Sequence, residues 1–266
     1  MSDTSNTRWQ PAQYEKFSGP RLRPALDLLH RVTLEEPRLL YDLGCGTGDV
    51  TRILANRFAN AEVIGVDSSS EMLARANEIE SRANWLEADI ASFEPSAPAD
   101  LLYSNAALHW LGNHADLFPR LARSLKEGGV LAVQMPQSWG QESHRLMRSV
   151  LEGGNDDASP LGSPALRASL AEPWVLKAST YFEILSPHLS TLDIWQTEYL
   201  HVLTGEDPVL EWVKGTGLRP ILDGLEKEDL DRFLDLYRGA LRRAYPRLDD
   251  GSTLYPFGRL FIVGRR

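Results

Sequence analysis

The stretch from Leu39 to Asp49, LLYDLGCGTGD, constrains the fold of this chain more than any other. It begins as a short apolar run, ends in three glycines spaced G-x-G-x-G, and leads into a helical pattern that includes Ile53 and Leu54. A strand that stops at glycines and turns into a helix brings bare backbone and the amide-rich start of a helix close to a ligand. A tight strand–helix turn that binds no ligand can have the same sequence, so the choice between the two depends on the residues downstream.

One departure in this turn indicates the kind of ligand. Asp49 stands where the dinucleotide fingerprint G-x-G-x-x-G has its last glycine. A carboxylate beside a pyrophosphate would repel it, which argues against NAD or FAD. The turn suits a ligand that is uncharged at that point and carries a cationic amine nearby, and S-adenosylmethionine (SAM) is such a ligand.

A second acid supports a nucleoside ligand. The run from Glu62 to Asp67 predicts a strand that ends in a carboxylate, about 20 residues past the glycines, where such folds place an acid against a ribose diol. The two oxygens of Asp67 can accept hydrogen bonds from both hydroxyls. The alternative is that Asp67 caps the helix predicted from about Ser69. The glycine turn and the spaced acid together favour the ribose role.

Strand and helix patterns alternate from residue 20 to residue 136, which predicts an α/β fold with a doubly wound, Rossmann-like parallel sheet. Further strands are expected at residues 84–90, 99–105 and 130–134. Two late strands, 192–203 and 255–263, are separated by about 50 residues of helical pattern. They predict an antiparallel closing pair in a seven-stranded sheet. Three domains are predicted: an N-terminal lid segment at 1–19, a core at 20–204 with 254–266, and an inserted helical cap at 205–253.

Composition excludes several classes of function. The net charge of -9 disfavours a broad phosphate-binding surface, so a nucleic-acid partner is not expected. No apolar stretch approaches the roughly 20 residues needed to cross a bilayer, and the polar start lacks a signal-peptide pattern. A single cysteine, Cys45, cannot form an internal disulfide, which fits a reducing compartment. We therefore expect a cytoplasmic protein without a membrane partner; the oligomeric state is not predicted.

The ordered set of motifs resembles the class I SAM-dependent methyltransferases. It comprises DLGCGTG at residues 42–48, the acid of GVD at Asp67, the EADI strand exit and a buried fourth strand. The resemblance implies that Gly44 to Gly48 lie against the methionine part of SAM, with Asp42 helping to hold its amine. It also implies that Asp67 takes the ribose hydroxyls. The full set of implied cofactor contacts is Asp42, Gly44, Cys45, Gly46, Gly48, Asp67, Ser68, Asp89, Ile90 and Asn105, with the aromatic residues Trp9 and Tyr14 of the lid segment.

Motifs outside this general set are similar to the family of trans-aconitate methyltransferases. They are NAALHWL at 105–111, VLAVQMP at 130–136, DIWQT at 193–197, WVKGTGLRP at 212–220 and RLFIV at 259–263. The resemblance implies a small tricarboxylate as methyl acceptor and a methyl ester with S-adenosylhomocysteine as products. Arg219 and Arg259 are the first candidates for binding the carboxylates, because guanidinium groups pair with them bidentately.

Other aromatic and histidine side chains could complete the acceptor pocket. The candidates are His109, Trp110, Tyr181, Tyr199 and His201. For each of these, taken alone, the sequence favours a core aromatic or a surface group over a role in binding. No metal site is expected. No general base is expected either, because a carboxylate is already nucleophilic at pH 7. Three alternatives remain open: a methyltransferase for another small metabolite, a non-catalytic SAM-binding sensor, and a nicotinamide oxidoreductase.

Overall fold

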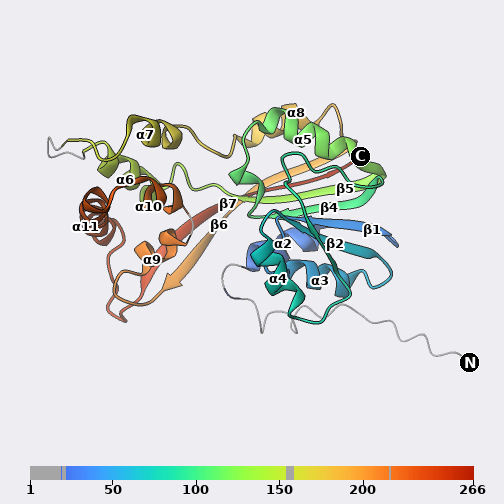
Figure 1. The fold of residues 1–266 in the computed structure, drawn as a ribbon, viewed down its shortest axis with the longest axis horizontal. Coiled ribbons are helices and arrows are strands. Elements are labelled where there is room, and N and C mark those ends of the chain that lie inside the picture. The colour runs from blue at the N-terminus through green and yellow to red at the C-terminus, as the bar shows by residue number, and fades with distance from the viewer. Residues whose placement is uncertain (1–18, 20–21, 154–158, 216) are drawn as a thin grey trace, which may run out of the picture. The chain divides into compact units, whose positions relative to one another are not determined.

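The computed structural model describes residues 19, 22–153, 159–215 and 217–266. Over these residues the chain forms a seven-stranded sheet of order β3-β2-β1-β4-β5-β7-β6 (Figure 1). The strands are β1 (Leu39–Leu43), β2 (Glu62–Asp67), β3 (Asn84–Glu87), β4 (Ala99–Asn105), β5 (Leu125–Pro136), β6 (Thr191–Leu203) and β7 (Thr253–Arg265).

The first five strands run parallel. Asp42 is in register with Gly65 of β2 and with Tyr103 of β4, and Asn105 is in register with Gln134 of β5. The carboxyl ends of these strands therefore meet at one edge of the sheet. The strand order reverses between β1 and β4, and open α/β sheets bind ligands at the carboxyl edge of such a switch point.

Strand β7 runs antiparallel to β5. The amide of Gly128 donates to the carbonyl of Arg266, whereas the amide of Gln137 donates to the carbonyl of Gly258. As the residue number rises on β5, that of its partner on β7 falls. The prediction of a doubly wound sheet with an antiparallel last strand is confirmed.

Helices cover both faces of the parallel strands. Figure 1 shows α2, α3 and α4 on one face and α5 and α8 on the other. The hydroxyl of Tyr103 donates to the carbonyl of Ala25 at 2.6 Å, which ties β4 to α2. The helices are α2 (Arg23–Arg31), α3 (Asp49–Arg57), α4 (Ser70–Asn77), η1 (Leu108–Trp110), α5 (His114–Arg123), α6 (Glu142–Leu151), α7 (Pro164–Ala171), α8 (Ala178–Leu185), α9 (Pro208–Lys214), α10 (Arg219–Gly224) and α11 (Lys227–Ala244).

The described residues divide into two compact units. The first comprises the described residues up to Met135 with Lys177–Trp195 and Phe261–Arg266, and the second comprises Pro136–Leu176 with Gln196–Leu260. The second unit thus includes α6, α7 and the adjoining ends of β6 and β7, in addition to the helical segment 205–253 predicted as a cap. The sequence prediction did not anticipate α6 and α7 in this unit.

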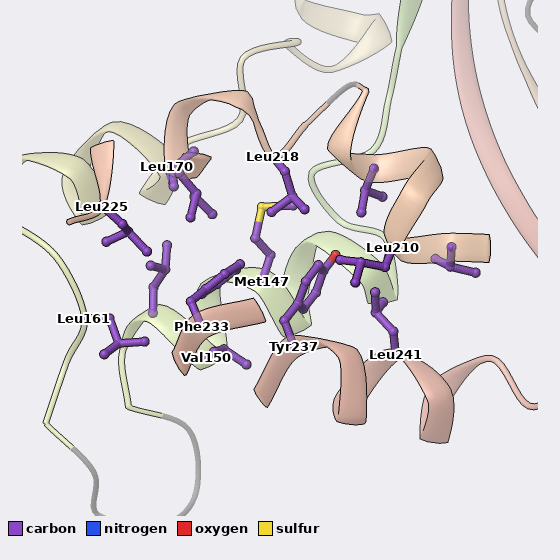
Figure 2. Close-up of a cluster of buried hydrophobic side chains, with 14 of the residues drawn as sticks. Met147, Val150, Leu161, Leu170, Leu210, Leu218, Leu225, Phe233, Tyr237 and Leu241 are labelled. Atoms are coloured by element: carbon purple, nitrogen blue, oxygen red, sulfur yellow. The ribbon is translucent and has the colours of Figure 1, made fainter. Parts of the chain in front are cut away.

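The second unit has its own hydrophobic core, shown in Figure 2. Three of its side chains are at most 2% exposed: Met147 of α6, Leu218 just before α10, and Phe233 of α11. Polar contacts join the same helices: the hydroxyl of Tyr237 donates to the carbonyl of Ser143 at 3.0 Å. The amide of Ser143 in turn donates to the hydroxyl of Tyr245 at 2.9 Å. Helix α6 is therefore part of this core, although β6 lies between α6 and α11 in the chain.

Several element boundaries differ from the prediction. Strand β5, expected at residues 130–134, begins at Leu125, because Leu125 pairs with Ala99 of β4. Strand β3, expected at residues 84–90, ends at Glu87. Among the described residues, no helix combines the length and the apolar character that crossing a membrane requires.

Candidate functional site

Three left-handed glycines form the turn between β1 and α3. Gly44, Gly46 and Gly48 have φ angles of 75°, 54° and 78°, a region that favours glycine. The amides of Gly44 and Cys45 both donate to the carbonyl of Val66, at 2.8 and 3.0 Å. The turn is therefore fastened to the end of β2, and its backbone is held in one conformation.

Close packing makes two of these glycines necessary. A Cβ on Gly44 would overlap the Cβ of Ala107, and a Cβ on Gly48 would overlap the ring of Trp85. A Cβ on Gly46, in contrast, would meet no described atom within 4 Å. Gly46 is thus the point at which the turn leaves room for another group. Trp85, on β3, was not identified from the sequence, because nothing in its local pattern indicates that it packs on the glycine turn.

The carboxylate of Asp67 is hydrogen-bonded to this turn. One oxygen accepts from the amide of Gly46 at 2.8 Å, and the other accepts from the amide of Ser69 at 2.9 Å. The cap of α4 is the hydroxyl of Ser69, which accepts from the amide of Met72 at 3.3 Å. Asp67 remains partly exposed, and each of its oxygens keeps an unused lone pair.

A second carboxyl, Asp42, lies beneath the turn. It is buried and accepts a hydrogen bond from the hydroxyl of Thr51 at 2.6 Å. Burial raises the pKa of Asp42 to about 7; the hydrogen bond from Thr51 opposes this rise and the charge of Asp67 adds to it. A nearby cation would favour the ionised form of this carboxyl. Thr51 is a further residue that sequence reasoning did not identify.

Cys45 is part of the same turn. Its side chain is buried, and burial raises the pKa of its thiol, with the charges of Asp42 and Asp67 adding to the rise. The thiol therefore stays protonated at neutral pH and is a poor nucleophile.

The exit of β3 brings Ile90 against the glycine turn. The Cδ1 atom of Ile90 lies 3.6 Å from the position that a Cβ on Gly44 would occupy. Asp89 is exposed, and its carboxylate accepts from the amide of Ala91 at 2.9 Å. Arg120 of α5 holds this exit by donating to the carbonyls of Ile90 and Ala91 at 2.9 and 2.8 Å. Its role follows from a tertiary contact, which the sequence pattern does not reveal.

At the end of β4, the chain turns sharply after Asn105. Ala106 has a φ angle of 53° and donates its amide to the carbonyl of Gln134 at 2.9 Å. The short helix η1 follows, in which the ring of His109 lies 4.5 Å from that of Trp110. His109 is buried and Trp110 is exposed. Ser68, at the end of β2, is exposed.

Tyr181 has an interior position in the first unit. Its side chain is fully buried, and its hydroxyl pairs with Nδ1 of His114 at 2.6 Å. Its ring packs 4.8 Å from that of Phe118. These contacts belong to the packing of α8 on α5, and a contact between Tyr181 and substrate stays a prediction.

Tyr199, His201 and Arg259 lie in the second unit, on β6 and β7. All three are buried. The ring of His201 lies 4.4 Å from Trp212 of α9, and the guanidinium of Arg259 lies 4.5 Å over the ring of Phe257. The guanidinium of Arg259 is thus positioned for a cation–π contact with Phe257. The sequence prediction did not include Trp212 as a member of this group.

The remaining predicted residues lie elsewhere. Arg219 is exposed and is the first residue of α10, the helix that follows α9 in the second unit. Trp9 and Tyr14 lie outside the described residues. Their predicted contacts with a cofactor stay predictions.

Several of the predicted cofactor residues, among them Gly46, Asp67 and Ile90, lie together at the carboxyl edge of β1 and β2. Ordered amides and an open approach at Gly46 lie next to the partly exposed oxygens of Asp67 and the apolar side chain of Ile90. These groups suit a neutral nucleoside with a vicinal diol, and the acidic pair Asp42 and Asp67 suits a cationic amino-acid end. A pyrophosphate would meet the carboxylate of Asp49, which is exposed beside the turn and paired with Arg52 at 2.7 Å.

Known structures share this fold. A putative methyltransferase from Bacillus halodurans matches with a TM-score of 0.56 and 14% identity, over 90% of this chain and 97% of that chain. Phosphoethanolamine N-methyltransferase 2 from Haemonchus contortus, solved in complex with SAM, matches with a TM-score of 0.54 and 18% identity, over 94% of this chain and 55% of that chain. Residues 40–129 match a family model described as a methyltransferase domain. The fold, the site and this domain match, together with the curated relatives described next, define a SAM-dependent methyltransferase.

Curated relatives then give the family. The chain is 46% identical to a trans-aconitate 2-methyltransferase from Methylobacterium nodulans, over 97% of this chain and 98% of the relative. It is 44% identical to another of that name from Pseudomonas paraeruginosa, over 97% of this chain and 94% of the relative. One from Azoarcus sp. is 42% identical over 97% of this chain and 99% of the relative. The chain belongs to the trans-aconitate 2-methyltransferase family.

Proposed function

We propose that this methyltransferase transfers a methyl group from SAM to a carboxylate of trans-aconitate, which gives a monomethyl ester and S-adenosylhomocysteine. The observation that carries this proposal is the 42–46% identity with relatives of that name, which extends over 96–97% of the chain. The identity therefore spans the second unit, where Arg219 and Arg259 lie, as well as the methyltransferase domain.

The residues of the first unit would hold the cofactor. Asp67 would accept from the ribose hydroxyls, and Asp89 with Ile90 would contact adenine. The amides of the glycine turn and the carboxyl of Asp42 would hold the amino-acid end. Gly46 leaves the open approach that such a ligand needs.

The acceptor would be held by cationic groups. Arg259 is buried and its guanidinium lies over Phe257, and this packing would limit the freedom of the side chain and so the entropy that it loses when a carboxylate binds. Arg219 would bind a second carboxylate. His109, Trp110, Tyr199 and His201 would complete the acceptor site.

The reaction requires little acid–base chemistry from the protein. When bound, SAM supplies a methyl group on a sulfonium. An oxygen of the ionised acceptor forms a bond to the methyl carbon as the carbon–sulfur bond breaks, and no proton has to be removed. The residues of this chain would act by orienting the acceptor and excluding water.

A consumption assay tests the proposal. SAM turnover with trans-aconitate, cis-aconitate and isocitrate should be fastest with trans-aconitate. Turnover of another small metabolite in their place would favour a different acceptor. Binding of S-adenosylhomocysteine without turnover of any acceptor would favour a SAM-binding sensor. Tighter binding of NADH than of S-adenosylhomocysteine in a thermal-shift comparison would contradict the methyltransferase assignment.

Arginine variants test the acceptor site. Arg219→Ala and Arg259→Ala should each raise the KM for trans-aconitate more than the KM for SAM, because each removes a charged donor to the acceptor. Equal changes in both constants would contradict the proposed positions.

The cellular setting follows from the same proposal. A single cysteine and the acidic net charge of -9 fit a cytoplasmic enzyme that acts on a small molecule rather than on nucleic acid. Cell fractionation followed by detection of the protein tests this expectation.

A further inference from the structure

Gln134 of β5 is a buried polar group without an evident structural role. Its side chain is fully buried. Among the described residues, neither its amide nitrogen nor its carbonyl oxygen has a hydrogen-bond partner. Burying a carboxamide without partners costs stability, so such a group in a native protein calls for an explanation, and a role in binding or catalysis is one.

A second carboxamide lies beside it. Asn105 is the register partner of Gln134 on the neighbouring parallel strand, so the two side chains lie on the same face of the sheet. The Oδ1 atom of Asn105 is also buried without a hydrogen-bond partner among the residues described. The two amides therefore form a pair at the carboxyl edge of β4 and β5, with one donor nitrogen and two carbonyl oxygens unused.

The position of this pair relates it to the methyl acceptor. The glycine turn follows β1, Asp67 ends β2, and Asp89 and Ile90 follow β3, so most of the proposed cofactor contacts lie on the β1–β3 side of the carboxyl edge. Asn105, which the family resemblance also assigns to the cofactor, ends β4 and lies where the cofactor and acceptor would meet. In the sheet order, β4 and β5 lie on the opposite side of β1 from β2. A cofactor anchored at β2 and β1 would direct its reactive end toward β4 and β5, where the carboxamide pair lies.

We propose that Gln134, with Asn105 beside it, hydrogen-bonds the reacting carboxylate of the methyl acceptor and selects which carboxylate is methylated. This inference rests on the proposed function. The amide nitrogen of Gln134 donates to one carboxylate oxygen, and the carbonyl oxygens of the pair repel a carboxylate that enters in another orientation.

A neutral donor suits this position better than an arginine does. A charge-assisted hydrogen bond is about twice as strong as a neutral one, so a guanidinium would stabilise the carboxylate in its ground state and weaken it as a nucleophile. A carboxamide orients the oxygen with less of this stabilisation. Arginines are then free to bind the carboxylates that do not react.

The test compares Gln134→Met with the wild-type protein. Methionine keeps the length of the side chain and removes both polar atoms. We expect kcat/KM for trans-aconitate to fall by about tenfold or more, the cost of losing one hydrogen bond to a charged group. We expect the Kd for S-adenosylhomocysteine, measured by calorimetry, to change by less than about twofold. NMR of the product should show esters of more than one carboxylate.

Thermal unfolding separates this role from a structural one. Replacing an unpaired buried amide with an apolar side chain should leave the melting temperature unchanged or raise it. Ser104→Ala is the matched control. Ser104 precedes Asn105 on β4, and its buried hydroxyl has a partner, because it donates to the carbonyl of Leu43 at 2.8 Å. That variant should melt at a lower temperature and still give a single ester.

The outcomes distinguish a failure of the proposed function from a failure of this inference. A wild-type protein that neither binds trans-aconitate in the presence of S-adenosylhomocysteine nor methylates it overturns the proposed function and this inference with it. Wild-type turnover with unchanged kcat/KM and a single ester from Gln134→Met overturns the inference alone.

Discussion

The backbone amide of Gly46 donates a hydrogen bond of 2.8 Å to the side-chain carboxylate of Asp67. These residues end different segments: Gly46 belongs to the turn after β1, and Asp67 is the last residue of β2. The acid therefore does two things at once, since it orders the glycine turn and keeps lone pairs for a ligand. Substitution of Asp67 should affect both stability and binding.

Asp67→Ala removes the side-chain oxygens that accept from two backbone amides, those of Gly46 and Ser69. We expect a decrease of about 1–3 kcal/mol in the free energy of unfolding and a loss of about tenfold or more in affinity for S-adenosylhomocysteine. Asp67→Asn keeps one acceptor oxygen and should give an intermediate loss in both. Denaturant unfolding and calorimetry measure the two effects. An unchanged affinity for the cofactor would remove Asp67 from the site.

Glycine substitutions in the turn should differ sharply. Gly46→Ala places a Cβ in open space at a φ angle of 54°, so only the backbone conformation is penalised, by about 1–2 kcal/mol. Gly44→Ala combines a φ angle of 75° with an overlap against Ala107, which adds about 1–3 kcal/mol. Denaturant titrations of the two variants test this order, and equal losses would show that Ala107 does not confine Gly44.

Local patterns predict much of this molecule. The apolar run before Gly44, the glycine spacing and the acid at Asp67 are short-range features, and each has a direct structural cause in strand burial, positive φ or strand termination. The sheet follows from the alternation of strands and helices, because parallel strands joined by helices have few compatible topologies.

Contacts between distant residues are not encoded in such patterns. Trp85 packs against Gly48, and Arg120 holds the carbonyl of Ile90, yet neither residue lies in a motif. Helix α6 joins the second unit through contacts such as that of Ser143 with Tyr237, which are 94 residues apart. An aromatic residue on a predicted helix likewise carries no sign of whether it faces a ligand or the core.

Tyr181 provides a direct test of that last ambiguity. Tyr181→Phe removes the hydrogen bond to His114 and leaves the ring contact with Phe118 in place. If the residue acts in packing, the free energy of unfolding should decrease by about 1 kcal/mol, and both Michaelis constants should stay unchanged. A raised KM for trans-aconitate with unchanged stability would instead support the predicted contact with substrate.

The buried carboxyl of Asp42 makes stability depend on pH. Its pKa rises from the ordinary 3.8 to about 7 in the folded protein, chiefly through burial. Between these two values the folded protein binds a proton that the unfolded chain has released. The contribution of Asp42 is therefore complete below pH 3.8 and is lost as the pH rises to about 7, with a slope of about 1.4 kcal/mol per pH unit at most.

A buried histidine acts in the opposite direction. Burial lowers the pKa of His144 from 6.5 to about 4, so its contribution is lost as the pH falls through that interval. The net curve of the wild-type protein combines both groups. Asp42→Asn removes the titrating carboxyl of Asp42, leaves His144 unchanged and keeps an acceptor for the hydroxyl of Thr51. The difference in stability between the two proteins therefore reports the titration of Asp42.

Denaturant unfolding of both proteins from pH 5 to pH 8 should show this difference. Relative to Asp42→Asn, the wild-type protein should lose stability as the pH rises to about 7 and then run parallel to the variant. Thr51→Val removes the hydrogen bond that favours the ionised carboxyl, so the pKa of Asp42 should rise and the loss should extend to higher pH. Parallel curves for the wild-type protein and Asp42→Asn over the whole range would contradict this prediction, because they would mean that Asp42 is ionised throughout. The carboxyl beneath the glycine turn would then be charged before any cationic ligand binds.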